Sequence, residues 1–116
     1  MALMLTSSGV ASRNARAAER VVELQIAKRR LQKDPGTIRV TAGDYVDLRW
    51  RTDEATTLHL HGYDLMLPLL PGNEARMRFQ ANATGRYPVS AHGFGDDAGK
   101  SSRREVVLLY LEVYPR

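Results

Sequence analysis

Short runs in which apolar and polar residues alternate follow one another along most of this chain of 116 residues. In an extended strand, successive side chains point to opposite faces, so each run has one face to bury and one for solvent. The clearest run is 45–52, in which Val46, Leu48 and Trp50 share one face. Turn residues such as Pro-Gly and Gly-Asp separate the runs at short intervals. Seven or eight strands in this pattern predict a single all-β domain built as a β-sandwich.

Two of the runs also indicate where they lie in their sheets. The run 65–70 contains Pro68, which cannot donate to a sheet ladder and therefore favours an edge position or a crossover over a central strand. The last run, 105–114, is apolar on both faces at its centre, as expected for a strand with neighbours on both sides. Alternation along all the runs predicts a core of Val22, Leu24, Ile26, Ile38, Val40, Val46, Leu48, Trp50, Met77, Phe79, Tyr87, Val89, Leu109 and Leu111.

The composition excludes several classes of function. The length suffices for one domain with a real core, and no apolar run approaches the length that spans a bilayer. The chain has no cysteine, which excludes disulfides, thiolate catalysis and sulfur-rich zinc or iron sites. It also lacks a nucleophile elbow, a paired-carboxylate arrangement and a phosphate-binding glycine loop. We therefore expect a protein that is not an enzyme.

The first 17 residues differ in character from the rest. They are apolar or small and end in Ala15-Arg16-Ala17, the small-residue pattern that signal peptidase cuts. This predicts export to the periplasm or outside the cell, with residues 18–116 as the domain; the alternative is a disordered or loosely helical arm. Cleavage after Ala17 would remove Arg13 and Arg16, leaving 15 basic against 13 acidic residues and lowering the net charge from +4 to +2. That small charge argues against nucleic acid as a partner.

The three histidines are the candidate metal ligands. His59 and His61 alternate on one run, and His92 ends a second run that follows Gly85. If the fold brings the two runs together, three imidazoles surround one divalent ion. His92 lies an odd number of residues after Tyr87 and Val89, so alternation places it on the opposite face of the strand. Its side chain is therefore expected to point away from the core unless the chain bends.

The order of these features resembles the cupredoxins, the small Greek-key copper domains, over residues 21–113. The resemblance depends on the Ala42-Gly43-Asp44-x-Val46 turn, the strand that ends in Phe79-x-Ala81 and the Gly85-x-Tyr87 segment before a histidine. His59-Leu60-His61-Gly62 is also similar to the His-x-His-Gly segment of multicopper oxidases, whose domains share that fold. The resemblance implies a Greek-key sandwich and copper as the cofactor.

The departures from the cupredoxin pattern decide what kind of copper site is expected. Blue-copper proteins use two histidines, a cysteine and an axial methionine. The cysteine position would fall on or near Ala91, and the segment 93–100 lacks a second histidine and a methionine. A multicopper cluster would need more histidines than this chain has. An all-nitrogen, non-blue copper site at His59, His61 and His92 is therefore the leading hypothesis.

Two other functions remain open from the sequence. One is a metal-free interaction module, in which the sandwich presents a surface to a partner protein or an envelope component. The other is binding of an anionic polymer through a basic sheet face, for which the candidates are Arg49, Arg51, Arg76 and Arg78. A solvated face is the simpler interpretation of these arginines.

Overall fold

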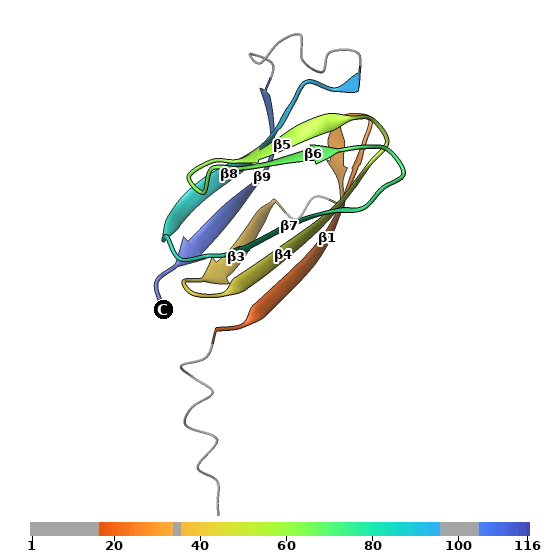
Figure 1. Cartoon of the computed structure of the whole chain (residues 1–116). Coiled ribbons are helices and arrows are strands. Elements are labelled where there is room, and N and C mark those ends of the chain that lie inside the picture. The colour runs from red at the N-terminus through yellow and green to blue at the C-terminus, as the bar shows by residue number, and fades with distance from the viewer. Residues whose placement is uncertain (1–16, 34–35, 96–104) are drawn as a thin grey trace, which may run out of the picture.

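The computed structural model describes residues 17–33, 36–95 and 105–116, which form two β-sheets that face each other (Figure 1). Residues 1–16, which carry most of the predicted leader, lie outside the described part. No described segment forms a helix long and apolar enough to cross a membrane. The strands are β1 (Glu19–Ala27), β2 (Arg30–Gln32), β3 (Thr37–Thr41), β4 (Tyr45–Thr52), β5 (Thr56–Leu60), β6 (Leu65–Leu69), β7 (Ala75–Gln80), β8 (Gly85–His92) and β9 (Glu105–Tyr114).

Both sheets are mixed. The four-stranded sheet has the order β2-β1-β4-β7, and the five-stranded sheet has the order β3-β9-β8-β5-β6. β1 runs parallel to β4, and β3 runs parallel to β9, while the other neighbours are antiparallel. β6 lies at an edge and β9 lies between two neighbours. Both placements confirm what Pro68 and the apolar final run predicted.

The core lies between the sheets and follows the alternation of the strands. All the predicted core residues are buried except Val22, Phe79 and Tyr87, which are partly buried against the others. Trp50 of β4 is fully buried. The sequence did not predict the buried positions that sit on short or wholly apolar runs, where alternation is hard to read: Leu58, Leu60, Leu69, Leu108 and Val113.

β2 is the strand that the sequence did not predict, and it brings the described strands to nine. It forms a hairpin with β1, in which Ala27 pairs with Arg30. The two residues between them, Lys28 and Arg29, both have positive φ, at 54° and 63°. Such turns usually carry asparagine, aspartate or glycine, so a Lys-Arg pair gave no signal of a hairpin.

One buried carboxylate holds several strand ends together. Asp44, in the turn between β3 and β4, is only 1% exposed. Its oxygens accept hydrogen bonds from the backbone N–H groups of Ala18 and Thr41, each at 3.0 Å, and from Arg116 at 2.7 Å. The guanidinium of Arg20 lies 3.5 Å away. Asp44 therefore joins the start of β1, the end of β3 and the C-terminal residue.

Candidate metal centre

The histidines lie on the outer face of the five-stranded sheet. Leu58 and Leu60, the neighbours of His59 on β5, are fully buried in the core, so His59 points outward. β5 pairs with β8 so that Thr57 lies opposite His92 and His59 lies opposite Ser90. Residues directly opposite in an antiparallel pair share a face. His92 therefore projects to the same outer face as His59.

The structure brings all three predicted histidines together. The ring centroids of His59 and His61 are 3.9 Å apart, and those of His59 and His92 are 5.7 Å apart. A fourth donor joins them, because Glu105 begins β9 directly opposite His92. One ligand atom from each of the four residues lies within 4.8 Å of the other three. The cluster covers Ser90, which is 1% exposed although it belongs to the outer face.

Glu105 links two of the imidazoles. The ring of His61 donates a hydrogen bond from Nε2 to Oε2 of Glu105, and Nε2 of His92 lies 3.3 Å from the same oxygen. Burial alone would raise the pKa of the Glu105 carboxyl, but the hydrogen bond from His61 and the charges of His61 and His92 hold that pKa below its ordinary value. The carboxylate is therefore in the ionised form that binds a cation.

The donor set fits a divalent ion. Nε2 of His92 is buried without a hydrogen bond of acceptable geometry, and its nearest acceptor is the Glu105 carboxylate. Two nitrogens on opposite sides of one ion, each bonded at about 2.0–2.1 Å, are about 4.2 Å apart. All four donor atoms lie within 4.8 Å of one another. The four donor atoms therefore lie close to the spacing that a common ion requires.

The turn after β5 fixes the position of His61. The backbone N–H of His61 donates to the carbonyl of Pro88 at 3.0 Å, and Gly62 follows with φ at +85°. A Cβ at Gly62 would fall within 3.0 Å of two ring carbons of Tyr87. That ring is itself held, because its hydroxyl donates to the carbonyl of Thr84 at 2.6 Å. The glycine after the second histidine thus lets the chain turn against a fixed aromatic ring.

Solved copper proteins share this two-sheet arrangement. A multi-copper oxidase from Pseudomonas thermotolerans superposes with a TM-score of 0.63 at 23% identity, over 87% of this chain and 31% of that chain. The copper nitrite reductase from Nitrosomonas europaea superposes with a TM-score of 0.61 at 18% identity, over 84% of this chain and 42% of the reductase chain. A third match is the metal-binding domain of the Cu(I)-exporting P-type ATPase CopA from Streptococcus pneumoniae D39, solved with Cu(I). It superposes with a TM-score of 0.58 at 15% identity, over 82% of this chain and 85% of that domain.

The chain has a cupredoxin fold. No protein-family model matches the sequence, and no curated protein matches it either. The chain spans less than two thirds of the length of the oxidase and reductase chains. At these identities the similarity establishes the cupredoxin fold and leaves the function to be argued from the site.

The structure answers the question that alternation raised about the direction of the His92 side chain. His92 does point away from the core, as alternation predicted, but His59 points away from it too, so no bend is needed. Ala91, near the position of the missing cysteine, faces inward opposite Leu58 and is 1% exposed. The candidate centre is therefore an outer-face site. Sequence reasoning missed Glu105, whose only signal is its position at the start of the final run.

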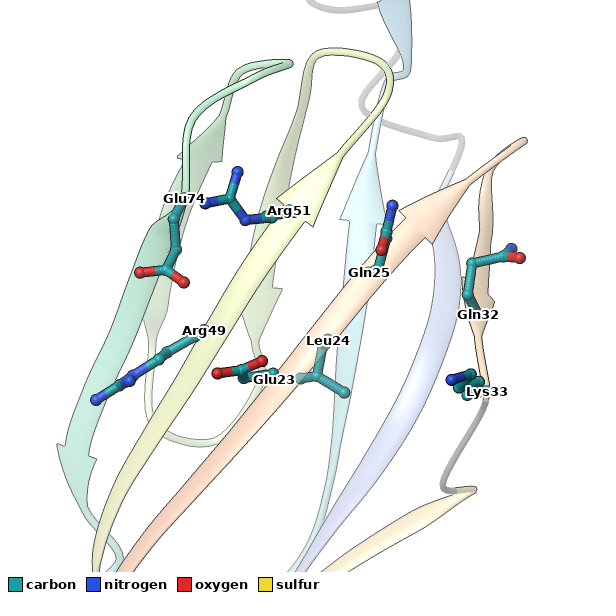
Figure 2. A pocket seen from close by; sticks show the side chains of 8 residues that line it. All are labelled: Glu23, Leu24, Gln25, Gln32, Lys33, Arg49, Arg51 and Glu74. Atoms are coloured by element: carbon teal, nitrogen blue, oxygen red, sulfur yellow. The ribbon is translucent and has the colours of Figure 1, made fainter.

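The predicted basic face lies on the other sheet and carries mixed charge. Arg49 of β4 pairs in register with Arg76 of β7, and a groove of about 270 Å³ runs beside Arg49 and Arg51. Figure 2 shows the carboxylates of Glu23 and Glu74 beside these arginines. Nη2 of Arg49 also lies 3.2 Å from the carboxylate of Asp47. The interleaved carboxylates weaken the case for an anionic polymer.

Proposed function

We propose that this chain is an exported domain that binds and hands on copper at a non-blue site formed by His59, His61 and His92 with Glu105, and that it catalyses no reaction itself. The observation that carries the proposal is the convergence of these side chains from three separate segments onto one outer face. Three imidazoles gathered on one face repel one another once they are protonated, whereas neutral imidazoles in this arrangement can share a cation.

The chemistry of the donors favours copper. Imidazole suits copper, zinc and nickel, and among divalent first-row ions copper binds most tightly to a given set of nitrogen and oxygen ligands. Three nitrogens and one carboxylate oxygen match the tetragonal sites that Cu(II) prefers. The names of the structural neighbours point the same way, since an oxidase, a reductase and an exporter domain with this fold are all copper proteins.

Titration with Cu(II) tests the site. We expect a weak d–d absorption, no intense blue band because no thiolate is present, and an EPR spectrum with nitrogen hyperfine structure. The double substitution His59→Ala, His61→Ala removes two of the proposed donors and should weaken Cu(II) binding about 100-fold. Both side chains project outward, so the fold should persist, which circular dichroism checks. Equal affinity in the two proteins would overturn the copper site and leave the metal-free interaction module.

A second pair of variants tests the carboxylate. Glu105→Gln keeps the shape of the side chain and removes its charge, so Cu(II) affinity should fall about tenfold. Glu112→Gln is the matched control, because Glu112 lies on the same strand and pairs instead with Arg39 and Arg86, each at 3.2 Å. The control should leave Cu(II) affinity unchanged. A similar loss in both variants would show that only the overall charge of β9 matters.

Export is supported by where the predicted cleavage point falls. β1 begins at Glu19, so cleavage after Ala17 leaves all the described strands intact. The new α-amino group would belong to Ala18, whose backbone nitrogen lies 3.0 Å from Oδ1 of Asp44. A buried carboxylate is a favourable neighbour for that ammonium. N-terminal sequencing of the protein expressed with its leader should give Ala18 first, and an intact Met1 would contradict export.

A further inference from the structure

Met66 lies beside the histidine cluster. β5 and β6 are neighbours at the edge of the five-stranded sheet (Figure 1), and their register places Met66 directly opposite His59. Directly opposite residues of an antiparallel pair share a face, with Cβ atoms about 4.5–5.5 Å apart. Met66 therefore projects from the same outer face as the three imidazoles and is the cross-strand partner of one of them.

The side chain of Met66 is not packed into the protein. It is 55% exposed, whereas Met77, the other methionine among the described residues, is 3% exposed in the core. A large apolar side chain normally stabilises a sheet by being buried. Because Met66 is about half exposed, it contributes little stability in this way. An unbranched side chain with three rotatable bonds can swing across to a neighbouring strand.

The two kinds of donor favour different oxidation states of copper. Imidazole nitrogen and carboxylate oxygen suit Cu(II), whereas a thioether is a soft ligand that selects Cu(I). We propose that Met66 supplies a thioether ligand with which the cluster holds Cu(I) as well as Cu(II), an inference that rests on the copper site proposed above. The domain then accepts copper in either state, with His59 common to both ligand sets.

The position of Met66 separates it from the axial methionine of blue-copper proteins. The resemblance would place that axial ligand after His92, in the segment where this chain has no methionine. Met66 instead comes from the edge strand β6, on the opposite side of β5 from β8 and His92. An edge position leaves the thioether accessible to an incoming ion.

Two Met→Leu variants test the inference. Cu(I) is supplied anaerobically with ascorbate and its affinity is measured by competition with a chromophoric chelator, while Cu(II) affinity is measured without reductant. Met66→Leu should weaken Cu(I) binding about tenfold or more, because a ligand is lost, and change Cu(II) binding by less than about twofold. Met77→Leu makes the same chemical change in the core, where this volume-conserving exchange is tolerated, and should alter neither affinity.

X-ray absorption of the Cu(I)-loaded protein gives a second measurement. A copper–sulfur shell should be present in the wild type and in Met77→Leu, and absent in Met66→Leu. A sulfur shell that persists in Met66→Leu, or an unchanged Cu(I) affinity, would overturn the role of Met66. The His59→Ala, His61→Ala protein separates the two proposals. If this protein loses Cu(II) binding while Met66→Leu has no effect on copper affinity, only the proposed role of the thioether is overturned. The proposed histidine site would then still stand.

Discussion

Replacing Gly62 by alanine is expected to destabilise the domain by about 2–5 kcal/mol. Two costs add together. The backbone at Gly62 has φ at +85°, a left-handed conformation that costs an L-residue about 1–2 kcal/mol. The new methyl group would also collide with the ring of Tyr87, and overpacking of this kind costs about 1–3 kcal/mol. The ring resists moving aside, because the Tyr87 hydroxyl shares its proton between the carbonyls of Ala83 and Thr84.

Gly72→Ala is the matched control for this experiment. Gly72 has nearly the same φ, +84°, but a Cβ there meets no atom within 4 Å. The Gly72→Ala protein should lose only the backbone contribution, about 1–2 kcal/mol. Urea unfolding of the two variants and the wild type gives the free energies of unfolding. Equal losses at the two glycines would show that Tyr87 moves aside freely and that the contact with its ring does not fix the turn.

The same substitution connects the fold to the site. Gly62 follows His61 directly, so any shift that relieves the clash with Tyr87 moves the imidazole that bonds to Glu105. We therefore expect whatever Gly62→Ala protein still folds to bind Cu(II) more weakly as well. The glycine of the His-x-His-Gly segment is thus explained by backbone conformation and by a close aromatic neighbour, and it needs no direct role toward a metal.

The strands and most of the core could be predicted because both depend on local alternation. Val46, Leu48 and Trp50 are buried on the face that the sequence assigned to them. The prediction failed where local rules carry no signal. β2 begins after a Lys-Arg turn with positive φ, and Leu58 and Leu60 are core residues on a short run that was not assigned to the core. Burial there depends on which sheet covers the strand, and a single sequence does not specify that.

The candidate site could be predicted only in part for the same reason. His59 and His61 share a face because they are two residues apart, a relation that is visible in the sequence. The approach of His92 and Glu105 depends on the register of β8 against β5 and β9. That register includes a shift between Val89 and Ser90, which local patterns do not reveal. The histidines could therefore be named as candidates, but the carboxylate between them could not.

The position of the proposed site on the outer face of the sheet would decide what kind of copper chemistry it supports. A cluster on the outer face, with Met66 and Val107 about half exposed beside it, lets an ion arrive and leave without unfolding any strand. A buried ion would exchange slowly. An accessible site without thiolate is suited to binding and transfer, whereas the electron-transfer sites of blue-copper proteins depend on their cysteine ligand.

Asp44→Ala is expected to cost about 3 kcal/mol of folding stability at pH 7. The substitution leaves the backbone N–H groups of Ala18 and Thr41 without their buried acceptor, and it removes the carboxylate that pairs with Arg116. Unpaired donors of this kind each cost about 1–3 kcal/mol, less where water reaches them. Asp53→Ala is the control, because Asp53 also accepts a backbone N–H, from Lys28 at 3.1 Å, but at an exposed position. The control should lose less than about 1 kcal/mol.

The stabilising effect of Asp44 should also depend on pH. Burial alone would raise the pKa of its carboxyl, but the hydrogen bonds from Ala18, Thr41 and Arg20 and the charge of Arg116 hold the pKa below its ordinary value of 3.8. A group whose pKa is lower in the folded state stabilises the fold above its unfolded pKa, and this contribution is lost as the pH falls through the folded pKa. Unfolding free energies of the wild type and Asp44→Ala should therefore differ most near neutral pH and converge as the pH falls below about 4. A difference that stays constant from pH 7 to pH 3 would mean that packing, and not the carboxylate charge, accounts for the loss.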